Sequence, residues 1–119
     1  APWQDGRPWH DYFGIANAPD ILSVIERRGG VSAIFQGHAH RLNFQERRCA
    51  AGRSCVFGVM PALIEYPVGW VQLTLTATQG HCMLRRLPLE QIANLSAQSG
   101  NGQSWRQGES AWWDYRFPL

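Results

Sequence analysis

The glycine pair Gly29-Gly30 separates two segments of different periodicity and constrains the fold more than any other feature of the chain. Before it, residues 17–28 carry apolar side chains at helical spacing, with Asn17 as a good N-cap and Pro19 in the first turn. The apolar stripe consists of Ile21, Leu22, Val24 and Ile25. After the glycines, residues 31–36 are short and almost entirely apolar, which is typical of a strand covered on both faces. The sequence therefore predicts a helix that stops at the glycines and leads into a buried strand.

Beyond residue 41 the sequence is dominated by strand patterns. The expected strands are residues 42–48, 55–59, 70–78 and 81–87. We expect hairpin turns at residues 50–53 and at Gln79-Gly80, followed by a short helix at residues 89–95. One helix followed by a mainly β segment indicates an α+β fold.

The composition changes at residue 96, so we divide the chain into residues 1–95 and residues 96–119. Residues 96–110 are rich in Ser, Gly, Gln and Asn, which favours a flexible tail. The tail ends in a cluster of aromatic residues, Trp112, Trp113, Tyr115 and Phe117. Because a free tail would not keep such a cluster exposed, we expect it to dock on the rest of the chain or on a partner.

Length and charge exclude several classes of protein. The chain has 119 residues, 45% of them hydrophobic and 17% charged, which suits a globular domain or part of one. A net charge of +2 without basic runs argues against a nucleic-acid polymer as partner. Neither a signal peptide nor an apolar run near the roughly 20 residues of a membrane span is visible. We expect a cytoplasmic protein without a membrane partner, and the start at Ala1, with no initiator Met, suggests a piece of a longer protein.

The three cysteines do not suggest a disulfide framework, because their number is odd. Cys49 and Cys55 flank the predicted turn and would face each other across the hairpin. They are either a pair or two small apolar strand residues.

Two of the four histidines, His38 and His40, follow the buried strand directly, behind Gly37 in the motif FQGHAHR. Residues two apart in extended chain point to the same side, so both imidazoles can aim at one ion or at two adjacent ions. Neutral imidazole is the commonest metal ligand, and α/β proteins place their chemistry beyond the carboxyl ends of buried strands. The glycine leaves room for a ligand to approach the backbone. Surface or core histidines without a ligand are the alternative.

The order of helix, Gly-Gly, apolar strand, GHAH and β segment resembles the calcineurin-like metallophosphoesterases, particularly the branch with the class III cyclic-nucleotide phosphodiesterases. The resemblance runs from about residue 11 to residue 63 and includes DYFGIANAPDILSVIERRGGVSAIFQGHAHRLNF and the later VFGVMPALIEY. It implies part of an αββα metallophosphoesterase sandwich. It also implies a hydrolase with a dinuclear centre of Mn, Fe or Zn, in which His38 binds one ion and His40 the other. A phosphomonoester, a phosphodiester or a cyclic nucleotide would be the substrate.

Two further site residues are candidates by their position, and the resemblance leaves a gap. Arg41, directly after His40, would reach a substrate phosphate, with a solvated surface arginine as the alternative. His10, in the aromatic-rich loop, would touch substrate or leaving group, with an incidental loop residue as the alternative. The family's upstream Asp-x-His, bridging Asp and Asn-His motifs are absent from the chain. Because two imidazoles alone cannot bridge two ions, we expect a C-terminal half that is inactive alone and that forms homo-oligomers or associates with the missing N-terminal half. The rival hypotheses are a non-catalytic β-rich interaction domain with a relic HxH, and a mononuclear metal site in which His10 joins the pair.

Overall fold

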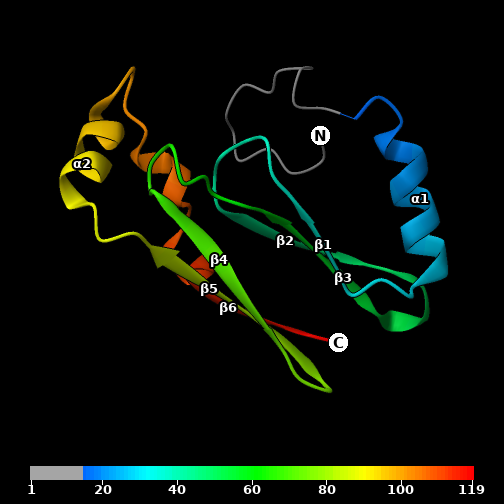
Figure 1. Cartoon of the computed structure of the whole chain (residues 1–119). Coiled ribbons are helices and arrows are strands. Elements are labelled where there is room, and N and C mark those ends of the chain that lie inside the picture. The colour runs from blue at the N-terminus through cyan, green and yellow to red at the C-terminus, as the bar shows by residue number, and fades with distance from the viewer. Residues whose placement is uncertain (1–14) are drawn as a thin grey trace.

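The computed structural model describes residues 15–119, which form a mixed α+β fold (Figure 1). The α-helices of this part of the chain are α1 (Ala18–Arg28) and α2 (Glu90–Gln98). The strands are β1 (Ala33–Gln36), β2 (Asn43–Arg48), β3 (Ser54–Val59), β4 (Gly69–Leu75), β5 (Gln79–Arg86) and β6 (Asp114–Pro118). Single 3-10 turns occur at η2 (Ala50–Gly52), η3 (Ser104–Gln107) and η4 (Ser110–Trp112). The prediction of an α+β fold is confirmed.

The first sheet has the strand order β1-β3-β2 and contains the predicted strand and hairpin. Strands β2 and β3 are antiparallel, with Asn43 opposite Val59, and the turn between them is η2. Strand β1 runs parallel to β3, with Ala33 opposite Val56. Within residues 15–119 it pairs on that side only, and Phe35 is 38% exposed. In this part of the chain β1 is therefore an edge strand. As expected, residues of β1 pack on both faces, Ala33 against the core between the sheets and Ile34 against the cluster under α1.

Helix α1 covers one face of the first sheet (Figure 1). The side chain of Ile25 in α1 is buried against Cys55 and Phe57 of β3. Gly29 ends the helix in the left-handed conformation. The predicted stripe is wider than the covered face, because Ile21 and Val24 are 41% and 47% exposed. Successive helical residues are about 100° apart, so only part of a four-residue stripe can face the sheet.

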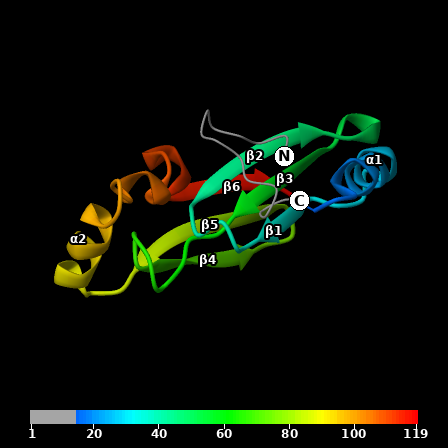
Figure 2. The same cartoon turned by 90° about the horizontal axis from the view of Figure 1, so that it is seen from above.

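The second sheet, β4-β5-β6, packs on the opposite face of the first sheet (Figure 2). Their shared core consists of Leu42, Phe44, Val56, Cys82 and Phe117. The described chain thus has a helix layer and two sheet layers. Helix α2 lies beyond one end of the second sheet and has no buried residue (Figure 1).

The turn between β4 and β5 lies earlier than the predicted Gln79-Gly80. Thr76 closes it, because its backbone N–H and its hydroxyl both donate to the carbonyl oxygen of Gln79, at 2.9 and 3.2 Å. Gly80 belongs to β5 instead, where the ring of Phe117 lies so close that a Cβ atom would overlap it. Glycine at position 80 therefore makes room for the ring of Phe117 and does not form the predicted turn.

Residues 96–110, expected to be flexible, are held to the body of the chain. They contain the end of α2 and η3, and their polar side chains bond to the rest of the protein. Ser96 Oγ accepts the backbone N–H of Tyr66 at 2.8 Å, and Gln107 Oε1 accepts the Tyr66 hydroxyl at 3.0 Å. The small polar residues that indicated a tail thus serve as hydrogen-bond partners. The aromatic cluster docks as expected, with Phe117 buried between the sheets.

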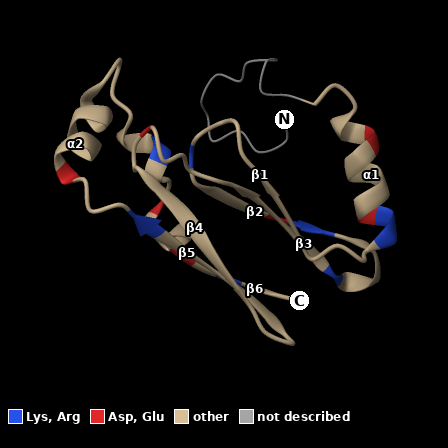
Figure 3. Ribbon diagram, viewed as in Figure 1, with Lys and Arg blue, Asp and Glu red and all other residues tan. Residues whose placement is uncertain are grey.

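Charged residues of both signs are spread over helices and strands (Figure 3). One ion pair links the layers, because Arg47 of β2 contacts Glu26 of α1 at 2.8 Å. No helix among residues 15–119 is long and apolar enough to cross a membrane.

Candidate functional site

Residues 37–40, which we call the GHAH loop, follow β1 at its carboxyl end. Both histidines adopt the left-handed conformation, with φ of 71° at His38 and 48° at His40. The backbone N–H of Ala39 donates to the carbonyl of Gly37 at 2.9 Å, which tightens the loop. Positive φ is uncommon for residues other than glycine and costs roughly 1–3 kcal/mol where it is imposed. The surrounding structure therefore holds both histidines in a strained conformation.

Glu65 fixes the ring of His40, because its Oε2 lies 2.8 Å from His40 Nδ1. An ionised carboxylate only accepts hydrogen bonds, so this contact requires the proton of the neutral imidazole to sit on Nδ1. The lone pair is then on Nε2. A metal-binding histidine commonly has this arrangement, with one ring nitrogen hydrogen-bonded to a carboxylate and the other available to the ion.

Arg106, in η3, holds the GHAH loop from the other side. Its Nη1 donates to the carbonyl oxygens of Ala39 and His40 at 3.0 and 3.1 Å, and lies 3.3 Å from Glu65 Oε2. Its own carbonyl accepts the backbone N–H of Leu42 at 2.7 Å. One guanidinium thus connects the loop backbone, the carboxylate and the C-terminal segment.

Asn43 lies just beyond the loop, at the start of β2, and is 1% exposed. Within the described part of the chain, neither polar atom of its side chain has a hydrogen-bond partner. A buried amide without partners costs about 1–3 kcal/mol. Among the described residues, the buried polar side-chain atoms that lack a hydrogen-bond partner therefore lie next to the loop.

His38, His40 and Arg41 lie on one short segment of the chain after β1. His10 lies outside the described residues. His81, the remaining histidine, is on β5 in the second sheet, where its Nε2 contacts Asp114 Oδ1 at 2.7 Å.

Sequence reasoning missed Glu65 and Arg106. Their contacts with residue 40 span 25 and 66 positions of the chain. Glu65 lies in the stretch VFGVMPALIEY that carries the resemblance, but nothing in that stretch marks it as a partner of His40. Arg106 also falls in the stretch whose composition predicted a tail. A weak signal existed only in the rarity of acidic residues, nine in the whole chain.

A complete metal site is not formed by residues 15–119 alone, because no group of three or more His, Cys, Asp or Glu there could hold an ion. What the chain offers is two imidazoles, one of them with its ring orientation fixed. Two of the three cysteines are not activated nucleophiles. All three are free, and burial raises the pKa of Cys55 and of Cys82 to about 11.

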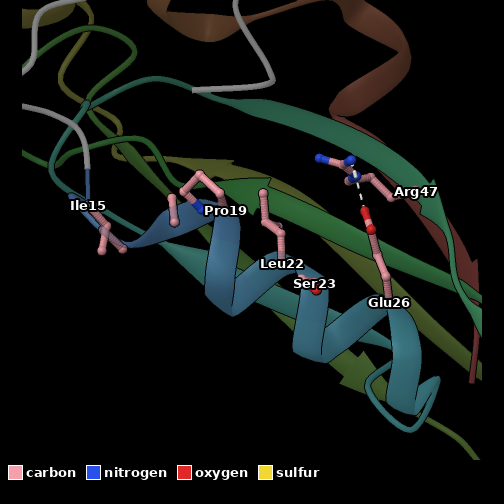
Figure 4. Close-up of a pocket in the computed structure, with 7 residues that line it drawn as sticks. Ile15, Pro19, Leu22, Ser23, Glu26 and Arg47 are labelled. Carbon is pink, nitrogen blue, oxygen red and sulfur yellow. Dashed lines mark ion pairs between the residues drawn. The ribbon is translucent and has the colours of Figure 1, made fainter.

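A separate pocket of about 420 Å³ lies between α1 and β2 (Figure 4). Ile15, Pro19 and Leu22 give it an apolar side, and the ion pair of Glu26 and Arg47 lies at its edge. Its lining residues come from α1, the turn before it and β2, so it is separate from the GHAH loop.

Comparisons with protein-family models, with curated proteins and with solved structures find no match to this chain.

Proposed function

We propose that this chain supplies His38 and His40 as ligands to a dinuclear metal centre that hydrolyses phosphoester bonds. The fold would be part of an αββα metallophosphoesterase sandwich, with α1 and the two sheets as three of its layers. The remaining ligands, among them the carboxylate that bridges the ions, would lie outside this chain. The chain alone would then be inactive.

The GHAH loop is the observation that carries the proposal. Two non-glycine residues of the loop that follows a parallel strand are left-handed, and both are histidines, with Ala39 between them. Such strain persists only where surrounding contacts impose it, and it gathers at functional sites. The carboxylate on His40 Nδ1 leaves the lone pair on Nε2 as a ligand, which suits Mn, Fe or Zn.

A bound pair of such ions supplies an activated water and neutralises phosphate charge. The residues of this chain would orient the two histidine ligands. The hydrogen bond between Ala39 and Gly37 tightens the loop backbone, and the contact with Glu65 orients the His40 ring. Arg41, next in the chain, is the candidate for contact with a substrate phosphate, and His10 is a second candidate.

The open edge of β1 is the surface on which we propose that a further strand associates. Its backbone groups on that side have no strand partner within residues 15–119. Unpaired strand edges readily accept another strand. In this proposal the strand belongs to the part of the site outside this chain, or to a second copy of the chain. Sedimentation at high concentration showing only monomers of the isolated chain would contradict this association.

Metal binding tests the ligand assignment directly. We expect Zn²⁺ to bind the 119-residue chain in calorimetric titration and the His38→Ala, His40→Ala double variant to lose that binding. The matched control is His81→Ala, which removes a histidine that also contacts a carboxylate but lies on the second sheet. Equal Zn²⁺ binding by the double variant and the wild type would overturn the proposal.

Activity tests the chemistry. With bis-p-nitrophenyl phosphate and Mn²⁺ we expect no turnover by the chain alone, and turnover once the missing ligands are supplied. Each 1.36 kcal/mol of lost transition-state stabilisation is about a tenfold loss in rate, so an incomplete centre should be inactive in practice. Turnover by the chain that survives in the double variant would show that these histidines are not the site.

A further inference from the structure

We propose that Glu65 and Arg106 are positioning residues for His40, and that they couple the GHAH loop to the C-terminal segment of the chain. The proposal rests on the proposed function in that it treats His40 as a metal ligand. The two residues come from different parts of the fold. Glu65 lies in the connection between β3 and β4, and Arg106 lies in η3.

The first step is the choice of tautomer. Glu65 Oε2 is 2.8 Å from His40 Nδ1 and takes its hydrogen bond. Free imidazole exchanges its proton between both nitrogens, so without the carboxylate the ring would spend part of its time with Nε2 protonated and unable to bind an ion. Glu65 therefore keeps one particular nitrogen available.

The second step concerns the carboxylate itself. Arg106 Nη1 lies 3.3 Å from Glu65 Oε2, and its side chain is only 16% exposed. The Arg106 Nε group also donates to Gln103 Oε1, which orients the guanidinium. The direction of the Glu65 carboxylate is thus fixed by Arg106, whose guanidinium is itself held by Gln103.

The third step concerns the backbone. The same Nη1 donates to the carbonyl oxygens of Ala39 and His40, at 3.0 and 3.1 Å. These carbonyls flank the left-handed residue at φ 48°. Arg106 therefore supplies contacts that oppose relaxation of the strained loop. The short segment 96–110 becomes part of the site.

A similar group of residues on the second sheet serves as the control for this test. There His81 Nε2 is 2.7 Å from Asp114 Oδ1, and Arg116 Nε is 3.7 Å from the same oxygen. This second His–carboxylate–Arg group has the same chemistry but lies away from the GHAH loop. Removing its carboxylate should leave His40 unchanged.

The test compares Glu65→Ala with Asp114→Ala in the 119-residue chain. The first readout is the tautomer of His40, measured without metal at pH 8 from the ¹⁵N shifts of its ring. The second readout is Zn²⁺ affinity by calorimetry. We expect Glu65→Ala to convert His40 from the Nδ1–H form to a mixture and to weaken Zn²⁺ binding about tenfold, the lower end of the range for lost carboxylate partners of ligands. Asp114→Ala should change neither.

Arg106→Lys provides a second, milder variant should Glu65→Ala disturb folding. A lysine keeps the charge but lacks the rigid fork of donors. We expect Zn²⁺ affinity to fall severalfold while His40 keeps its Nδ1–H form, because Glu65 remains. A merely structural role for Arg106 would leave the affinity within twofold of the wild type.

The outcomes separate this proposal from the proposed function. If the wild type binds no Zn²⁺, the ligand assignment fails, and the tautomer measurement alone decides whether Glu65 orients the ring. If the wild type binds Zn²⁺ but Glu65→Ala retains both the tautomer and an affinity within twofold, the positioning role is overturned. A changed tautomer with unchanged affinity overturns it as well.

Discussion

The ring of Phe44 in β2 stacks on the ring of Tyr115 in β6, with centroids 4.5 Å apart and ring planes at 6°. The pair joins the two sheets across their shared core. It also joins the hairpin that follows the GHAH loop to the last strand of the chain. The C-terminal strand is therefore part of the domain core.

The stacked pair should show a coupling energy in a double-mutant cycle. We expect Phe44→Leu and Tyr115→Leu to destabilise the protein individually, and the cycle to give about 0.5–1.5 kcal/mol of interaction beyond the area each buries. Denaturant unfolding of the wild type, both single variants and the double variant measures this. Purely additive effects would mean that the stacking geometry contributes nothing.

Gly80→Ala should destabilise the chain strongly. An added Cβ atom would overlap the ring of Phe117, which is itself buried. Overpacking of this kind costs about 1–3 kcal/mol. The control is Gly30→Ala, where a Cβ meets nothing within 4 Å. The thermal midpoints of the two variants should differ clearly, and equal midpoints would contradict the packing described at Gly80.

The three cysteines should differ in reactivity toward thiol reagents. Cys55 and Cys82 are buried, and burial raises the pKa of each from 9.0 to about 11, whereas Cys49 is partly exposed. A rise of two pKa units leaves about a hundredfold less thiolate near pH 8. We expect Cys49 alone to be modified in the native protein, as peptide mass mapping would show. Rapid labelling of Cys82 without denaturant would count against the prediction.

The same shifts predict alkaline destabilisation. Burial disfavours the thiolate in the native state, so the contribution of such a thiol to stability is fully present below the unfolded pKa of 9.0, where both states keep the proton. Above that value the unfolded chain releases protons first, so this contribution to stability is lost as pH rises from 9.0 through about 11. Replacing both residues, as Cys55→Ala with Cys82→Ala, should flatten the pH dependence of unfolding in that window. A dependence that stays equally steep would exclude the thiols as its cause.

Local signals in the sequence were enough for the elements that precede the site. The spacing of Leu22 and Ile25 and the stop at Gly29 correctly placed α1, and the apolar run placed β1. The partners of His40 could not be predicted in this way. Glu65 and Arg106 reach the loop only after two sheets have packed, and the hydrogen bonds to Ser96 and Gln107 that hold the C-terminal segment are equally non-local. The composition of residues 96–110 predicted a flexible tail, but polar groups of this segment form hydrogen bonds with the rest of the chain.

Asn43→Leu should stabilise the fold. Leucine branches at Cγ as asparagine does and carries no polar atom, and within residues 15–119 the buried amide has no partner to lose. Removing an unsatisfied buried polar group should raise the free energy of unfolding by about 1–3 kcal/mol. The control is Gln45→Leu in the same strand, where the side chain is only partly buried. A loss of stability in Asn43→Leu would indicate that the amide has a partner in the folded protein.

The strain in the GHAH loop predicts an inverted order of stability between glycine and alanine. His38→Ala and His38→Gly both remove the imidazole, and they differ only in the Cβ atom at a residue with φ 71°. The left-handed conformation costs a residue with a Cβ atom roughly 1–2 kcal/mol, a cost that glycine avoids. The glycine variant should therefore be more stable than the alanine variant by about 1 kcal/mol in denaturant unfolding. Ser23 in α1 is the control, since in a helix glycine is about 1 kcal/mol worse than alanine. Should His38→Gly be the less stable of its pair, as at Ser23, the loop backbone is not strained and the main support for a functional role of the GHAH loop disappears.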